Sequence, residues 1–194
     1  SRPEDYDEFT TIEVGGPDPN GAGLFGLDNT EGLDRGNLRL NDYIGGFNAI
    51  AEVEGNFAFG GVFIESFLSF SEASKKKNQL ATPLFNQIFS PFTPELGGRP
   101  ADHAELQGGE RRAQLAEAVR VLAALIGNTM AHEFGHSLGL ALGDGSHNPE
   151  DNDRELMDAG LNRSFAERAE LGEFQARPAG FMEKHRQYLT QILP

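Results

Sequence analysis

The chain has 194 residues, no cysteine and a formal net charge of −14. This length suits one domain, the lack of cysteine excludes a disulfide framework, and the acidic balance argues against nucleic acid or an anionic membrane as the main partner. No apolar run reaches the roughly eighteen residues that a membrane-spanning helix needs, so we expect no membrane span.

The first half of the chain predicts short strands between polar turns. Its β-branched and alternating residues favour strands over 10–14, 41–51 and 61–67. Residues 15–37 are rich in Gly, Asp, Asn and Pro, which favour a loop because these residues stabilise tight turns. We expect no helix before residue 70.

Two segments of this loop carry several side-chain oxygens, Asp18-Pro19-Asn20-Gly21 and Asp28-Asn29-Thr30. Bonds from such side chains to the nearby backbone stabilise turns, and this is the interpretation that we favour. Calcium binding is the alternative because Ca²⁺ prefers oxygen ligands. The spacing of the acidic residues differs from that of an EF-hand loop.

The second half of the chain predicts helices. Apolar residues recur at intervals of three and four over 110–141, which predicts one long helix that Gly127-Asn128 could kink. Before it, the proline-rich residues 78–109 favour a long loop excursion with a short helix over 84–88. After it we expect a helix over 164–171, which begins with capping-box spacing, and a final helix over 181–193.

Near its end, the long predicted helix carries the sequence His132-Glu133-Phe134-Gly135-His136. Residues four apart lie on the same face of a helix, one turn apart, so both imidazoles can bind one metal ion. Glu133 can take a proton from a metal-bound water, and we predict it as the catalytic base. Gly135 costs the helix around 1 kcal/mol relative to alanine, which favours a close approach of a neighbouring segment.

Zinc sites of hydrolases usually have three protein ligands and one open position. A third ligand must therefore follow the two helix histidines. His147 comes soon after the helix, and a left-handed cap at Gly139 or Gly143 can turn the chain back toward the metal. We predict His147 as the third ligand.

Other acidic and histidine residues remain as alternatives. Asp144 is the second choice for the third ligand, because a carboxylate also binds zinc and it is closer to the helix end. Glu167 or Glu170 would serve if the ligand were a glutamate on a separate helix. His103 and His185 are interpreted as surface or packing histidines.

The motif residues resemble the metzincin clan of zinc peptidases. The pattern of this clan is His-Glu-x-x-His-x-x-Gly-x-x-His (or Asp), followed by a Met-turn. His132, Glu133, His136 and Gly139 match this pattern in place. The resemblance implies a zinc-dependent endopeptidase that acts on a peptide or protein substrate.

The chain departs from the clan's pattern at the third-ligand position and is similar to it at the Met-turn. Leu142 stands where the clan has its third ligand, so the resemblance is to a bacterial type with a loop lengthened to His147. The segment Leu156-Met157-Asp158-Ala159-Gly160 is similar to the Met-turn, which implies that Met157 lies beneath the metal as a structural residue. The clan's tyrosine after this methionine is absent, and Tyr188 and Tyr43 are the candidates to replace it.

The resemblance also implies an α+β fold of the zincin type, with a twisted mixed β-sheet over a long active-site helix and a small C-terminal helical part. A single catalytic domain would consist of the sheet and loop excursion at 1–109, the active-site helix at 110–141 and the remaining residues at 142–194. One edge strand, from 43–51 or 60–67, would pair with an extended peptide through main-chain hydrogen bonds.

Two further expectations concern location and activity. The first residues do not have the pattern of a signal peptide, and we expect a secreted, extracellular or periplasmic protein whose leader is not in this chain. The alternative to a peptidase is an interaction or adhesion module on the same fold that binds zinc or calcium without catalysis.

Overall fold

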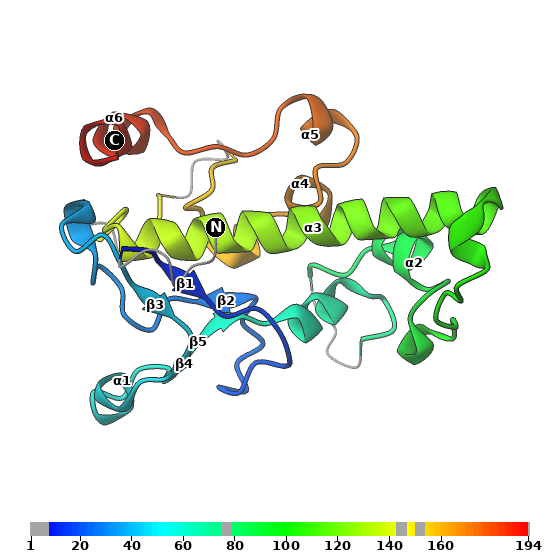
Figure 1. Cartoon of the computed structure of the whole chain (residues 1–194), viewed down its shortest axis with the longest axis horizontal. Helices are drawn as coiled ribbons and strands as arrows, with labels where there is room; N and C mark the ends of the chain where they lie inside the picture. The colour runs from blue at the N-terminus through cyan, green and yellow to red at the C-terminus, as the bar shows by residue number, and fades with distance from the viewer. Residues whose placement is uncertain (1–7, 75–78, 143–146, 150–153, 194) are drawn as a thin grey trace. The chain divides into compact units, whose positions relative to one another are not determined.

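The computed structural model describes residues 8–74, 79–142, 147–149 and 154–193. Over these residues the chain is an α+β protein with one long helix, several short helices and two small sheets (Figure 1). The expected α+β class is confirmed at this level. Contacts divide the chain into a first unit, residues 1–66, 128–163 and 179–194, and a second unit, residues 67–127 and 164–178. The single catalytic domain stays a prediction.

The strands of the first unit are short and pair in both directions. Strand β1 (Thr11–Ile12) pairs in parallel with β3 (Tyr43–Ile44). Strand β5 (Phe59–Val62) lies between β2 (Gly26–Leu27) and β4 (Gly46–Phe47) and is antiparallel to both. Parallel and antiparallel pairs therefore occur together in this unit. β1 confirms a strand within 10–14.

The region predicted as one strand over 41–51 is broken into strands β3 and β4 and a helix. Gly46 has a φ of +59°, which bends the chain in a conformation that favours glycine. Asn48 then begins helix α1 (Ala49–Val53), because its side chain accepts the backbone N–H groups of Ile50 and Ala51 at 2.9 and 3.3 Å. The expectation of no helix before residue 70 is therefore wrong.

The third strand begins and ends earlier than the predicted 61–67. Strand β5 stops at Val62, and the next turn begins where the N–H of Ser66 donates to the carbonyl of Phe63 at 3.0 Å. A 3₁₀-helix at Ile64–Phe70 follows. Apolar residues in a short run suit a buried strand and a buried helix equally, so periodicity could not separate the two.

Helix α3 (Gly109–Ser137) is the long helix at the centre of Figure 1. It runs without interruption through Gly127-Asn128, where the buried Asn128 accepts a hydrogen bond from Arg163 at 2.8 Å. It ends at Ser137 and not at residue 141. Gly139 has a φ of +90°, and the predicted left-handed cap is found there.

The second unit has an aromatic core. The rings of Phe70, Phe85 and Phe165 lie with centroids 5.3 to 6.3 Å apart, and all three side chains are buried. They come from the end of the 3₁₀-helix, from helix α2 (Pro83–Phe89) and from helix α4 (Phe165–Arg168). α2 confirms the short helix expected at 84–88. The predicted cap at Ser164 is also found, but the helix ends at Arg168 instead of residue 171.

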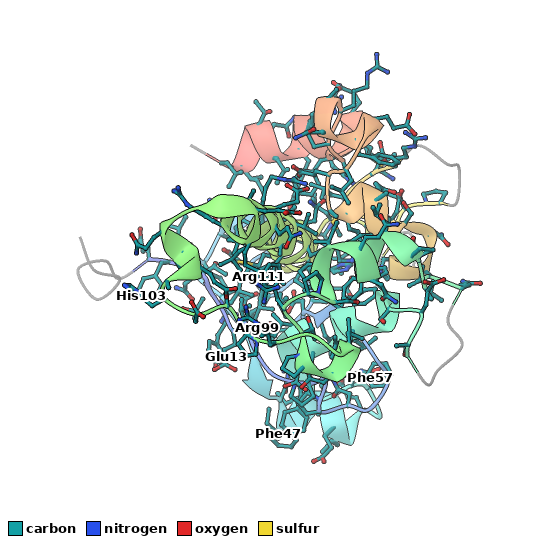
Figure 2. The ribbon with its side chains drawn as sticks, turned by 90° about the vertical axis from the view of Figure 1, so that its right-hand side faces the viewer. Glu13, Phe47, Phe57, Arg99, His103 and Arg111 are labelled. Atoms are coloured by element: carbon teal, nitrogen blue, oxygen red, sulfur yellow. The ribbon has the colours of Figure 1, made fainter. Side chains whose placement is uncertain are left out.

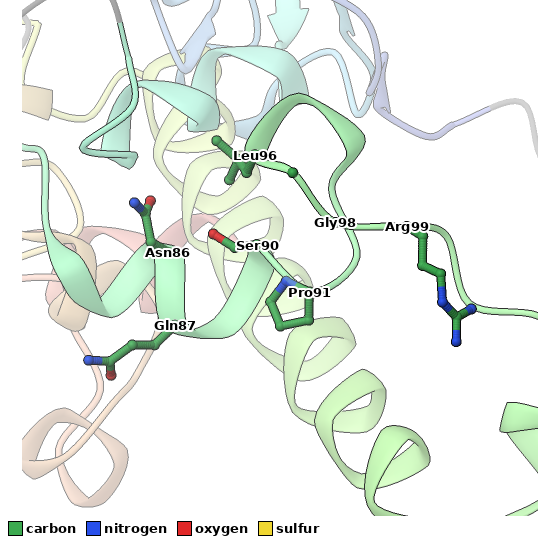
Figure 3. A pocket seen from close by; sticks show the side chains of 8 residues that line it. Asn86, Gln87, Ser90, Pro91, Leu96, Gly98 and Arg99 are labelled. Atoms are coloured by element: carbon green, nitrogen blue, oxygen red, sulfur yellow. The ribbon is translucent and has the colours of Figure 1, made fainter.

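Charged groups and a hollow occupy the surface of the second unit. Glu105 forms ion pairs with Arg99 at 2.5 Å and with Arg111 at 3.3 Å, and both arginines are labelled in Figure 2. The hollow has a volume of about 640 Å³ and includes Asn86 and Ser90 (Figure 3). Arg99, the charged residue of its lining, is directed away from the other labelled side chains and toward Glu105.

The C-terminal segment contains helices α5 (Glu173–Ala176) and α6 (Glu183–Ile192). α6 confirms the final helix expected within 181–193. In the described part of the chain, no helix combines the length and apolar character needed to cross a bilayer.

Candidate metal centre

The two motif histidines lie side by side on the last turns of α3. The Nε2 atoms of His132 and His136 are 3.0 Å apart, and their side chains are 9 % and 6 % exposed. The spacing of four residues produces this geometry directly, because one helical turn contains 3.6 residues.

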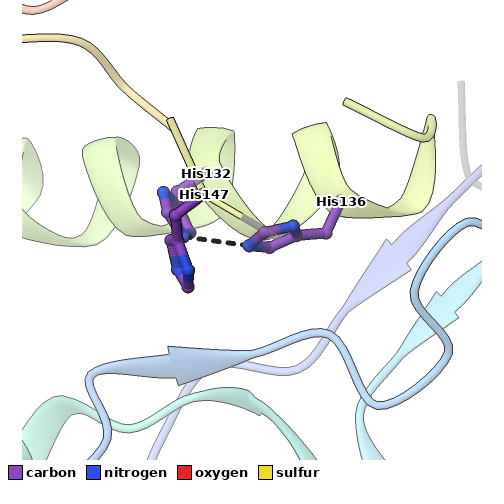
Figure 4. Close-up of side chains that lie close together, drawn as sticks. All are labelled: His132, His136 and His147. Carbon is purple, nitrogen blue, oxygen red and sulfur yellow. Dashed lines mark hydrogen bonds between the residues drawn. The ribbon is translucent and has the colours of Figure 1, made fainter. Parts of the chain in front are cut away.

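His147 joins them from the segment after the helix. Its ring centroid lies 5.3 Å from that of His132 and 5.4 Å from that of His136 (Figure 4). One nitrogen from each of the three rings lies within 4.8 Å of the others, and this group could hold a metal ion. Leu142 is exposed, and Asp144 lies outside the described residues. Within the described ranges, Glu167 and Glu170 are not part of such a group.

The partners of the Nδ1 atoms of His132 and His136 determine which ring nitrogen carries the proton and which has the free lone pair. Nδ1 of His132 lies 2.5 Å from the backbone carbonyl of Leu156, which can only accept a hydrogen bond, so Nδ1 carries the proton. Nδ1 of His136 lies 3.5 Å from the carboxylate of Glu31, which favours a proton there too. Both Nε2 lone pairs are then directed at the space between the two rings.

This arrangement fits a cation. With both rings neutral and protonated at Nδ1, the two Nε2 lone pairs, 3.0 Å apart, are available to a bound cation. Tetrahedral coordination with zinc–nitrogen bonds of 2.0 to 2.1 Å places ligand nitrogens about 3.3 Å apart, close to the separation found. The donor set of three imidazoles suits zinc and other first-row transition metals, and the identity of the metal is not settled by it.

The charges around His136 also favour a cation. Burial opposes protonation of this imidazole, but the neighbouring Glu31 carboxylate, with the charges of Glu133 and Asp28, outweighs burial and raises its pKa. The same carboxylates that stabilise an imidazolium would stabilise a metal ion bound to the neutral ring.

The end of α3 explains how Glu31 reaches His136. The last carbonyl groups of a helix have no partner within the helix. Here the backbone N–H groups of Gly32 and Asp34 donate to the carbonyls of His136 and Ser137 at 2.9 and 3.1 Å. The loop that was expected at 15–37 therefore wraps the end of α3 and brings Glu31 beside His136.

Glu133 is held by strand β2 and the residue that follows it. Its side chain is 5 % exposed, and its Oε2 accepts the backbone N–H of Asp28 at 2.8 Å. A Cβ atom at Gly26 would lie 2.5 Å from Oε1 of Glu133, so any larger side chain there would displace this carboxylate. Glycine at position 26 therefore permits the approach of the strand to the predicted base.

Met157 packs against α3 at Gly135, the glycine between the two motif histidines. The side chain of Met157 is fully buried, and a Cβ atom at Gly135 would lie 2.5 Å from its Sδ atom. This is the close approach that a glycine inside the helix predicted, and Met157 is the neighbour. The size of the residue at position 135 therefore decides how near the turn can come to α3.

The turn around Met157 supports two of the three histidines. The N–H of Asp158 donates to the carbonyl of Glu155 at 3.1 Å, which closes the turn. The carbonyl of Leu156 holds His132, and the carbonyl of Met157 accepts the N–H of Asn148, the residue after His147, at 3.0 Å. One turn thus contacts both the helix histidine His132 and the segment that carries His147.

Sequence reasoning missed the residues that support the centre from the N-terminal half. They are Gly26, Asp28 and Glu31. Asp28 was noted only as a turn or calcium residue, and nothing local in the sequence connects any of the three with the motif. A glycine at the end of a strand followed by acidic residues is too common to indicate such a role.

The remaining tyrosine and histidine candidates have other partners or are surface and packing residues. Tyr188 donates its hydroxyl hydrogen to the carbonyl of Leu138 at 2.9 Å, and the hydroxyl of Tyr43 bonds to Glu13. His103 is exposed (Figure 2), and His185 is buried on α6, as the surface and packing interpretation expected.

The geometry of the Asp18 loop supports turn chemistry. Oδ2 of Asp18 accepts the backbone N–H groups of Ala22, Gly23 and Leu24 at 2.8 to 3.1 Å. Oδ1 accepts both the backbone and side-chain N–H groups of Asn20. This carboxylate is therefore already solvated by the loop that it closes.

Comparisons of the chain with protein-family models, with curated proteins and with solved structures gave no match. The resemblance to the metzincin clan consequently rests on the motif residues and stays a prediction.

Proposed function

We propose that the chain is a zinc-dependent endopeptidase in which His132, His136 and His147 hold the metal and Glu133 is the general base. The observation that carries this proposal is the convergence of three histidine nitrogens within 4.8 Å beside a buried glutamate of the same helix. The secreted or periplasmic location and the metzincin-type fold belong to the same proposal.

Zinc, when bound, polarises a peptide carbonyl and lowers the pKa of water to about 7. The chain's own contribution is a positioned base. Glu133 takes a proton from the attacking water as the water oxygen bonds to the carbonyl carbon. It then returns this proton to the nitrogen of the leaving amine as the carbon–nitrogen bond breaks. The Asp28 N–H at 2.8 Å fixes one oxygen of Glu133 and so orients the other.

The sheet order changes which strand is proposed to bind the peptide. β5 is paired on both sides, so the expected binding edge at 60–67 is wrong for residues 60–62. The two ends of the order β2-β5-β4 are β4, which lies within the expected edge at 43–51, and β2, whose Gly26 contacts Glu133. We therefore assign peptide pairing to β2, since a substrate bound there would pass the base.

Zinc content and peptide cleavage test the proposal. Wild-type protein is expected to hold about one zinc per chain and to cleave peptides, and His147→Ala to lose both properties. Glu133→Gln is expected to keep zinc and to lose about 10²- to 10⁴-fold in kcat, because general base catalysis contributes this much. Unchanged kcat in purified Glu133→Gln would overturn the assignment of the base.

A second candidate function is a zinc-binding interaction module without catalysis. The hydrogen bond from the Asp28 N–H favours it, because one carboxylate oxygen of Glu133 is already engaged with the backbone. Stoichiometric zinc with no cleavage of a broad peptide library would support this candidate over the peptidase.

A further inference from the structure

The first unit contains a cavity of about 610 Å³ beside the metal centre. Its walls are the segment 27–33 on one side and α1 with the residues after it on the other. Pockets that bind small ligands usually measure 300 to 1,000 Å³. The cavity is therefore large enough for a substrate side chain with its neighbouring backbone.

Two residues connect this cavity with the proposed catalytic groups. Asp28 lines it, and the backbone N–H of Asp28 holds Glu133 at 2.8 Å. Glu31 also lines it, and its carboxylate lies 3.5 Å from Nδ1 of His136. A peptide at the metal centre would thus have this cavity within reach of a side chain.

The cavity combines apolar walls with acidic groups. Leu33, Ile50 and Phe57 supply the apolar part and are 41 %, 70 % and 49 % exposed, and Figure 2 shows Phe57 near the margin of the ribbon. Three carboxyl groups, those of Asp28, Glu31 and Glu54, share the lining. In the described part of the chain, no lysine or arginine lines the cavity.

Asp28 has a buried acceptor oxygen without a donor among the described residues. It is 6 % exposed, and its Oδ1 accepts the N–H and hydroxyl of Thr30, each at 2.8 Å. Its Oδ2 is buried without a hydrogen-bond partner in the described chain. A buried oxygen with no donor costs free energy that a bound ammonium or guanidinium would recover.

We propose that this cavity is a specificity pocket that binds a lysine or arginine side chain of the peptide substrate. The aliphatic stem would pack on Leu33, Ile50 and Phe57, and the charged end would meet Asp28 and Glu54. This inference rests on the proposed peptidase function, since it names the substrate class of the same site.

Paired peptides test the pocket directly. They differ only in one residue near the cleaved bond, lysine in one and norleucine in the other, which keeps the stem and removes the charge. Wild-type protein is expected to cleave the lysine peptide with a kcat/KM about tenfold or more above that of the norleucine peptide, since bonds to charged groups are strong. A ratio near one at every position around the cleaved bond would overturn the proposal.

Two variants locate the effect. Asp28→Asn keeps the backbone N–H to Glu133 and an oxygen for Thr30, and it removes the buried charge. Glu54→Gln removes a charge at the exposed end of α1. Each is expected to lower the lysine-to-norleucine ratio severalfold, while Glu52→Gln, on the same helix but outside the cavity, keeps the wild-type ratio. Unchanged ratios in both cavity variants would overturn the proposal.

Binding separates failure of the pocket from failure of the peptidase. If no peptide is cleaved, the proposed function fails, and calorimetric titration of the same full chain with the two peptides still decides the inference. Tighter binding of the lysine peptide by about tenfold, lost in Glu54→Gln, would support the pocket. Equal affinities of the two peptides would overturn it.

Discussion

The two units of this chain bury different chemistry. The second unit is centred on the phenylalanine rings of Phe70, Phe85 and Phe165, and the two buried charged residues of its described part, Glu167 and Arg168, are adjacent in sequence and opposite in sign. The first unit buries polar and charged side chains, including those of Asp28, Asp34, Asp42, His132, Glu133 and His136. Packing of apolar rings stabilises a fold directly, whereas a buried charge costs free energy unless a partner compensates for it. The comparison shows that the first unit retains, around His136, buried carboxyl groups whose charge a bound cation would compensate.

The free-energy cost of burying these charged groups is concentrated around His136, and we interpret it as a sign of a functional site. Carboxylates gather around His136 and raise its pKa, although burial alone would lower it. Perturbed titratable groups of this kind concentrate at catalytic and metal sites more than in structural cores. The second unit has no three-residue metal group in the part of it that the structure describes. Stability and chemistry are therefore expected to respond to different substitutions.

The largest effect on stability is expected from Phe165→Ala. The Phe165 ring is 2 % exposed and lies 5.3 and 5.4 Å from the rings of Phe70 and Phe85. Its loss is expected to lower the free energy of unfolding by about 3 to 5 kcal/mol, measured by urea denaturation. Zinc affinity of the folded protein is expected to stay within about twofold, because the Phe165 ring packs on rings of the second unit and the three histidines belong to the first.

Phe9→Ala is the matched control, because Phe9 is 43 % exposed and its removal leaves no cavity. A fall in zinc affinity in Phe165→Ala as large as that in His136→Ala would show that the two units are not separable in this way.

The next effect concerns the buried carboxyl of Asp28. Burial raises its pKa from 3.8 to about 6, so the folded state favours the protonated carboxyl. The stability that this preference contributes is fully present below about pH 4 and is lost as pH rises through 6. A shift of this size corresponds to about 3 kcal/mol. Asp28→Asn does not undergo this loss, so its unfolding free energy relative to wild type is expected to rise by up to about 3 kcal/mol between pH 4 and 7.5.

Urea denaturation of the metal-free protein at the two pH values measures this difference. An identical difference between variant and wild type at both values would contradict it. With the pocket proposal, the expected result is a variant that is more stable at neutral pH and less selective for basic side chains, which is a common conflict between stability and function.

The smallest effect is expected from Glu31→Gln. The carboxylate of Glu31 faces Nδ1 of His136 at 3.5 Å, and removal of such a partner of a metal-binding histidine typically lowers metal affinity about 10- to 100-fold. Competition with a chromophoric chelator measures the affinity for zinc. Glu52→Gln serves as the control of equal charge change on α1. Equal zinc affinities of the Glu31→Gln and Glu52→Gln proteins would show that Glu31 does not support metal binding by His136.

Local patterns in the sequence determined the helices and the motif. The repeat of apolar residues at three and four positions predicted α3, and the spacing of His132 and His136 placed both rings on one face. Gly135 indicated a close neighbour, and Gly139 indicated the left-handed end of the helix. These features depend on helix geometry, which is the same in every protein.

Local sequence patterns did not predict the bounds of the short strands or which strands pair. The segment 41–51 reads as one strand, but the positive φ of Gly46 and the cap at Asn48 divide it. The position of β5 between two partners, which excludes it as a binding edge, follows from pairing with β2 and β4. Strand preference is strongly dependent on context, so tertiary contacts decide it.

Only the tertiary structure decided how the centre is assembled. Sequence proximity suggested His147, but its place beside the other rings depends on the turn at Met157, whose carbonyl holds Asn148 at 3.0 Å. The Asp28 N–H reaches Glu133 across 105 positions of sequence. The sequence thus determined which groups the helix presents. The fold decided which distant backbone and carboxylate groups surround them, because such contacts form only when long loops close on a packed helix.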